Sequence, residues 1–244
     1  MSLYEKRVDG RKNDELRELK IERNYLMYPE GSVLVSQGNT KVICTASVVE
    51  NVPKFLIESF SGWITAEYNM IPRATQTRNN RESRRGQLKG RTVEIQRLIG
   101  RSLRAAFNLR MIGERTIKVD CDVIQADGGT RCASITGGFV AVFDALRYLH
   151  NEGLISQFPD YTLVAAISVG MKDGTYLLDL NYEEDSRVDV DMNIVMNEEE
   201  KFIEVQGTAE RNLYDQAQLL ELLALGKKGA LQIMEYQREI LNLK

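Results

Sequence analysis

The residues most suggestive of chemistry form one run, Asp127-Gly128-Gly129-Thr130-Arg131. Adjacent glycines let backbone amides approach an anion, and a helix that starts here would add positive potential at its N-terminus. The Thr130 hydroxyl can donate to a phosphate oxygen, and the Arg131 guanidinium can donate two hydrogen bonds. Because a GGT turn is by itself more often only a turn, this anion-binding interpretation needs support from its context.

A second cation, Arg91, opens a predicted basic helix and could reach the same anion from another element. The ordinary alternative is a solvated arginine at a helix end. Two arginines directed at one site would form a clamp suited to phosphate.

A third group of candidate residues is acidic and flanks a predicted strand: Glu183, Glu184, Asp185, Asp189 and Asp191. Positions 189 and 191 of a strand point to the same side. Carboxylates grouped in this way suit a Mg²⁺ site or a general acid whose pKa is raised by its neighbours. The ordinary alternative for 183–185 is an exposed, charged turn. His150 falls near a predicted helix end, which argues against a histidine-based triad.

Hydrophobic periodicity predicts the elements that position these residues. Strands are expected at 18–25, 32–37, 41–49, 116–125, 161–170, 175–182, 188–196 and 202–206, the first three in an antiparallel sheet. Helices are expected at 91–107, from 135 to about 151, and from about 213 onward. Strands and helices grouped without strict βαβ alternation favour an α+β fold of mixed sheets packed with helices.

No repeat and no Pro/Gly/Ser-rich linker divides the chain, so one domain over 1–244 is expected. Its N-terminal part, about 10–142, would hold the phosphate site and the basic helix. Its C-terminal part, about 158–225, would hold the acidic site, and a closing helix would run to 244.

Positive charge is concentrated in one stretch of the chain. The net charge is −3, but residues 73–104 contain ten Lys or Arg and only two acids, Glu82 and Glu94. Such a run is either a solvated face or a binding surface for a polyanion, and RNA is a reasonable candidate. Three aromatic residues nearby could stack on bases or pack in the core: Phe60, Trp63 and Tyr68.

Composition argues against secretion and against a membrane span. Three cysteines, Cys44, Cys121 and Cys132, are an odd number without CxxC spacing, so neither a disulfide framework nor a zinc site is predicted. The first residues are charged and lack an apolar core, and the longest apolar stretch, 161–171, is about half a membrane-spanning helix. A cytoplasmic protein without membrane contact is expected.

Several segments together resemble the ribonuclease PH family. They are GNTKVICTASV (38–48), GWITAEYNMIPRATQTRN (62–79), GRTVEIQRLIGRSLRA (90–105), DCDVIQADGGTRCASITG (120–137), EDSRVDVDMNIVM (184–196) and EVQGTAE (204–210). The resemblance runs from RVDGR at 7–11 to the final helix. GWITAEY favours the stand-alone bacterial enzyme over an exosome ring subunit.

The resemblance implies a fold like domain 2 of ribosomal protein S5 and a homo-hexamer built as a trimer of dimers. It also implies reversible 3′-to-5′ phosphorolysis of RNA, especially tRNA 3′ ends, with release of nucleoside diphosphates. Carried over by position, phosphate would be held by Arg91, Gly129, Thr130 and Arg131. The acidic pair Asp185 and Asp191 would be catalytic and would bind Mg²⁺, with Asp189 in a supporting role.

Two positions depart from the family pattern: Gln76 replaces a histidine and Asn69 replaces a glycine. Both concern the RNA channel and subunit contacts, where RNA-binding roles are expected for Arg73, Arg78 and Arg81.

Three rival functions remain open. They are a non-catalytic, exosome-like RNA-binding ring subunit, a hydrolytic metallonuclease using Asp185, Asp189 and Asp191, and a plain RNA-binding module.

Overall fold

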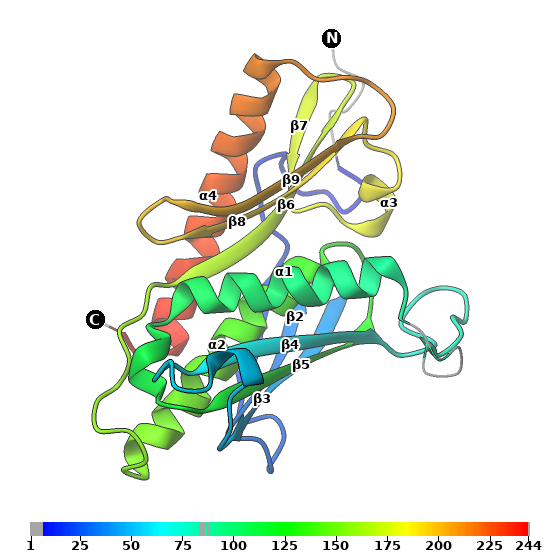
Figure 1. The fold of residues 1–244 in the computed structure, drawn as a ribbon. Helices are drawn as coiled ribbons and strands as arrows, with labels where there is room; N and C mark the ends of the chain where they lie inside the picture. Colours follow the sequence, from blue (N-terminus) through cyan, green and yellow to red (C-terminus); the bar gives the residue numbers. More distant parts are fainter. Residues whose placement is uncertain (1–6, 83–85, 87, 244) are drawn as a thin grey trace.

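The chain folds around two β-sheets, which the computed structural model describes over residues 7–82, 86 and 88–243 (Figure 1). The first sheet has five strands in the order β1-β2-β3-β5-β4. Their bounds are Leu19–Arg23 (β1), Gly31–Gln37 (β2), Thr40–Val49 (β3), Trp63–Met70 (β4) and Thr116–Gln125 (β5). The pairs β1–β2, β2–β3 and β3–β5 are antiparallel, whereas β4 pairs with β5 in parallel.

The second sheet has four antiparallel strands in the order β7-β6-β8-β9. Their bounds are Val164–Lys172 (β6), Thr175–Leu178 (β7), Val190–Asn197 (β8) and Phe202–Ala209 (β9). A short helix, α3 (Tyr182–Asp185), lies between β7 and β8.

Three long helices cover and connect the sheets: α1 (Gly90–Ala106), α2 (Thr130–Asn151) and α4 (Gln216–Ile240). Single 3₁₀ turns occur at Lys54–Leu56 and Leu109–Ile112. The α1 helix crosses over the first sheet and faces the second, and α4 packs on β6, β7 and β8 (Figure 1).

The α2 helix joins the two halves into one core because it packs against β2 and β3 of the first sheet and against β6 of the second. Gly137 permits this close approach, since a Cβ there would lie 2.3 Å from Val35 Cγ2. By length and composition alone α2 could cross a membrane, but 89% of its apolar window is buried inside the protein. It is a core helix, and in the described part of the chain no other helix passes that test.

The α+β fold class is confirmed, and three element predictions are corrected. The strand β4 was not predicted, although Ile64, Ala66 and Tyr68 alternate inward along it. The predicted strand 175–182 ends at Leu178, because Asp179 adopts a left-handed conformation with φ 55° and α3 follows. The predicted helix from 135 begins earlier, at Thr130, directly after the glycine turn.

Candidate functional site

The glycine turn connects the end of β5 to the start of α2. Gly128 and Gly129 have φ angles of 73° and 66°, a region that side chains disfavour. A Cβ at Gly128 would also lie 2.5 Å from the Leu180 carbonyl oxygen. Gly129 is the N-cap residue of α2 and provides no capping side chain. The first amides of this helix therefore remain available to an anion.

A pocket of about 310 Å³ opens at this turn, where the two halves of the molecule meet. Its walls include Arg91 from the first turn of α1 and Gly128 through Arg131 from the turn and α2. On the other side it is lined by Asp185, Asp191 and Glu210. The four residues predicted to bind phosphate thus face the same cavity as the two predicted catalytic carboxylates.

Thr130 and Arg131 are each oriented by one neighbour. The Thr130 hydroxyl lies 2.9 Å from the Tyr68 hydroxyl of β4, and Arg131 Nη1 donates to Gln206 Oε1 of β9 at 3.0 Å. Burial raises the pKa of Tyr68, and the positive charges of Arg91 and Arg131 oppose that rise. Both guanidinium groups therefore act on the same small volume.

The acidic wall has an unusual proton affinity. Asp191 on β8 has its pKa raised to about 6, mainly by burial and next by the charge of Asp185, while Arg131 opposes the rise. The pKa of Asp185 is also raised, mainly by burial, with Arg131 and Arg91 opposing. A carboxyl with a pKa near 6 can both hold and release a proton close to neutral pH.

Asp191 also has an unsatisfied oxygen. Its Oδ1 atom is buried without a hydrogen-bond partner among the described residues, and Oδ2 accepts only a long bond, 3.5 Å, from Asn193 Nδ2. A buried carboxylate oxygen in this state suits a proton or a cation. Among the described residues no group of three or more His, Cys, Asp or Glu has metal-binding geometry, and the carboxylates that line this pocket are Asp185, Asp191 and Glu210.

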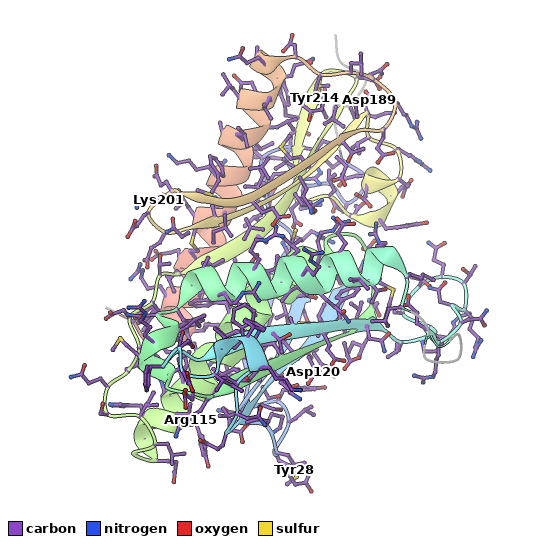
Figure 2. All side chains as sticks on the ribbon, in the orientation of Figure 1. Tyr28, Arg115, Asp120, Asp189, Lys201 and Tyr214 are labelled. Carbon is purple, nitrogen blue, oxygen red and sulfur yellow. The ribbon has the colours of Figure 1, made fainter. Side chains whose placement is uncertain are left out.

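The other three predicted acids have structural partners instead. Glu183 forms an exposed ion pair with Arg187 at 2.8 Å. Glu184 is buried, and its Oε1 accepts from Arg7 Nε at 2.7 Å. Asp189 precedes β8, and its carboxylate accepts from the Asp173 backbone amide at 2.8 Å. Figure 2 labels Asp189 in the half of the molecule formed by the second sheet, and it is not among the pocket-lining residues.

The predicted RNA-binding arginines lie outside the pocket, on the segment that joins β4 to α1. Arg73, Arg78 and Arg81 are exposed, and Arg78 Nη1 donates a long hydrogen bond, 3.4 Å, to Asn80 Oδ1. The segment is anchored beside the site, because the Ala74 carbonyl accepts from the amide of Ala126 at 2.8 Å. Of the basic run, 83–85 and residue 87 lie outside the described residues.

The departures Asn69 and Gln76 are both exposed, and the Asn69 side chain accepts from the amide of Met70 at 2.8 Å. Of the three aromatic candidates, Tyr68 is buried, and Trp63 packs against Phe55 and beneath Arg104. Only Phe60 is largely exposed, at 78%.

Sequence reasoning missed several residues that shape the pocket. Glu210 lines it from the end of β9, although it closes the quoted segment EVQGTAE. Ser168, Tyr182 and Asn193 also line it. No local pattern marks these three, since each comes from a different element.

Comparisons with known proteins show the family of the chain. The model of the 3′ exoribonuclease family matches residues 15–147 with its domain 1 and 162–229 with its domain 2. A protein named Ribonuclease PH from Corynebacterium kroppenstedtii is 55% identical over 236 residues, 97% of this chain and 93% of the relative. A Ribonuclease PH from Listeria welshimeri is 55% identical over 239 residues, 98% of this chain and 96% of the relative.

Solved structures share the fold at lower identity. One, described as the Archaeoglobus fulgidus exosome with RNA bound to the active site, has a TM-score of 0.79 and 23% identity, covering 95% of this chain and 92% of that one. The crystal structure of rice (Oryza sativa) Rrp46 has a TM-score of 0.77 and 21% identity, covering 96% of this chain and all of the other.

Proposed function

The chain belongs to the 3′ exoribonuclease family, and we propose that its pocket removes nucleotides from the 3′ ends of RNA by phosphorolysis. The protein is then a nucleotidyltransferase rather than a hydrolase. One observation carries the proposal: the glycine turn with two arginines and a pair of carboxylates line a single cavity. A hydrolase would need only an activated water and no second anion site.

In the proposed reaction, inorganic phosphate rests against the start of α2, held by Arg91, Arg131 and the Gly129–Thr130 backbone. The two guanidinium groups offset the repulsion between this phosphate and the terminal phosphodiester. An oxygen of the bound phosphate attacks the phosphorus of the last nucleotide, and the bond to the departing ribose O3′ breaks in line. The products are a nucleoside diphosphate and an RNA shortened by one nucleotide with a free 3′ hydroxyl.

The departing O3′ needs a proton or a compensating positive charge. Without bound Mg²⁺, burial and next the charge of Asp185 raise the pKa of Asp191 to about 6, which suits this group to deliver the proton. Reversal of the same steps would add a nucleotide from a diphosphate, with Asp191 taking the proton back.

Asp185 and Asp191 are also the residues that would hold Mg²⁺, and the unpaired Oδ1 of Asp191 supports this assignment. Mg²⁺ usually binds one or two carboxylates together with substrate phosphates. When bound, it would supply positive charge at the leaving oxygen.

The RNA itself would approach along the basic segment between β4 and α1, with Arg73, Arg78 and Arg81 contacting phosphates. We propose tRNA precursors as the main substrate and other RNA, including rRNA precursors, as further ones. A homo-hexamer, a trimer of dimers, is proposed from the family resemblance, and exposed apolar side chains such as Phe55, Ile57 and Phe60 offer surface for assembly. A cytoplasmic location is proposed, in keeping with three buried, unpaired cysteines.

The test is incubation of the protein with a tRNA that carries a short 3′ extension and Mg²⁺, with and without phosphate. Nucleoside diphosphates released only with phosphate would support phosphorolysis. Monophosphates released regardless of phosphate would make the protein a hydrolase. Tight RNA binding without release would indicate the non-catalytic ring subunit.

A further inference from the structure

A buried arginine, Arg17, bonds both to the glycine turn that precedes α2 and to the segment that precedes α3. Arg17 comes from the segment before β1 and is only 6% exposed. It is not among the pocket-lining residues, so it does not itself face a substrate. Its partners nevertheless belong to the glycine turn on one side and to the segment leading to α3 on the other.

On the acidic side, the partner of Arg17 is Asp179, which is 1% exposed and lies between β7 and α3. The guanidinium donates to both carboxylate oxygens, from Nη2 at 2.6 Å and from Nε at 3.1 Å. The backbone amide of Arg17 adds a third bond to the same carboxylate at 2.8 Å. These bonds fix Asp179 in the segment that leads into α3. Because Asp185 is the last residue of α3, the position of this segment also affects the position of Asp185.

On the phosphate side, Arg17 Nη1 donates to the backbone carbonyl of Asp127 at 2.6 Å. The guanidinium also packs directly under the turn, because a Cβ added at Gly129 would lie 2.9 Å from Nη2. Asp127 makes a second link of its own, since its Oδ1 accepts from the Tyr182 amide of α3 at 3.2 Å. The glycine turn is thus linked to Asp179 through Arg17 and to α3 through the side chain of Asp127, and the link through Arg17 contains the ion pair.

A neighbouring arginine fixes α3 but does not reach the turn. Arg7 donates to Glu184 and to the backbone carbonyl of Leu178 at 2.6 Å, and it is 3% exposed. It holds α3 within the second half of the molecule. Of these two arginines, only Arg17 spans from that half to the phosphate-binding turn.

We propose that Arg17 is a positioning residue that sets the distance and angle between the phosphate-binding turn and the carboxylates of α3 and β8. In-line attack requires the bound phosphate and the leaving oxygen to be placed together, and an error of about 1 Å can cost roughly 100-fold in rate. This inference rests on the proposed phosphorolysis and adds a residue that touches neither reactant.

The experiment compares Arg17→Lys with Arg23→Lys. A lysine keeps the charge but cannot span two partners with one planar group. Arg23 is a matched control, because it makes the same kind of pair, Nη2 to Asp144 Oδ1 at 2.5 Å and Nη1 to the Ile240 carbonyl at 2.8 Å, away from the pocket. Three quantities are measured for each variant: kcat with saturating RNA, the Kd of inorganic phosphate by titration, and Tm.

We expect both variants to lose similar thermal stability, and only Arg17→Lys to lose about tenfold or more in kcat. Its phosphate Kd should stay within about threefold of wild type, since Arg91 and Arg131 remain. An unchanged kcat in Arg17→Lys would overturn the inference, and so would a loss confined to phosphate affinity. Should Arg17→Lys not fold, Asp179→Asn keeps the shape of the pair and must lower kcat in the same way.

The same assay separates this inference from the proposed function. A wild-type protein that releases diphosphates, together with an unaffected Arg17→Lys, would remove only the positioning role. A wild-type protein that releases no diphosphates in the presence of phosphate would remove both.

Discussion

The two walls of the pocket are built by different means. Apart from Arg91 of α1, the phosphate wall is a continuous piece of chain, in which a glycine turn and the first residues of α2 provide amides, a hydroxyl and a guanidinium. The acidic wall is assembled from the ends of three elements, α3, β8 and β9, which provide Asp185, Asp191 and Glu210. A site made from one segment can be recognised locally, whereas a site made from several depends on contacts that only the fold creates.

The largest effect on the phosphate wall should come from Arg131→Ala. Removing a charged donor from a preorganised anion site typically costs about 100- to 1000-fold in rate, and we expect phosphorolysis to be nearly abolished. The fold should persist, because the Arg131 side chain lines the pocket and donates to Gln206 of β9. The release of nucleoside diphosphates and the Tm are measured for Arg131→Ala and for a control, Arg187→Ala. The exposed ion pair of Arg187 with Glu183 lies outside the pocket. Wild-type turnover by Arg131→Ala would remove the phosphate assignment.

On the acidic wall, Asp185→Asn and Asp191→Asn should each lower kcat by about 100-fold or more, because proton delivery and cation binding fail together. Glu183→Gln serves as the control, since this carboxylate is exposed and absent from the pocket. Turnover is measured over a range of Mg²⁺ concentrations. Equal losses in all three variants would remove the assignment of the catalytic carboxylates to Asp185 and Asp191.

A stability measurement tests the acidic wall without activity. Because the pKa of Asp191 is raised in the folded state to about 6, its stabilising contribution is present below the ordinary value near 4 and is lost as pH rises through 6. Without Mg²⁺, Asp191→Asn should therefore be more stable than wild type above pH 6, by roughly 1 to 3 kcal/mol. The difference should disappear near pH 4. Urea unfolding at both pH values checks this, and a constant difference would contradict the raised pKa.

The smallest effects are expected at the basic segment, outside both walls. Arg73→Ala or Arg78→Ala should weaken tRNA binding or assembly a few-fold. The slope of the logarithm of the binding constant against the logarithm of the salt concentration should fall by about 1, the value for one lost phosphate contact. Phosphate affinity should not change. The affinity for tRNA at several salt concentrations and the mass in solution are measured for each variant. Lys20→Ala is the control, because Lys20 is an exposed cation on β1. Unchanged affinity and mass would remove the segment's role.

Much of the fold could be predicted because the signals were local. Strict alternation over 116–125 predicted β5, and helical spacing after Arg91 predicted α1. The parallel pairing of β4 with β5 could not be predicted, because it depends on how the intervening helix returns the chain.

The acidic residues show the same limit within the site. Glu184 and Asp185 are adjacent in sequence, yet Glu184 is paired with Arg7, 177 residues away, and Asp185 faces the pocket. A successive helical position turns by about 100°, so neighbours on α3 meet different surroundings. Arg17 gave no signal either, because both of its partners are more than 100 residues distant.

The burial of α2 between the two sheets has a consequence for hydrogen exchange. Central, tightly packed helices open only when the whole domain unfolds, whereas exposed segments open by local fluctuation. The amides of α2 should therefore be among the slowest to exchange, and those of the exposed residues 76–81 among the fastest. The anion site would then disappear only at the global unfolding transition, while residues 76–81 could rearrange many times within the lifetime of a single native molecule.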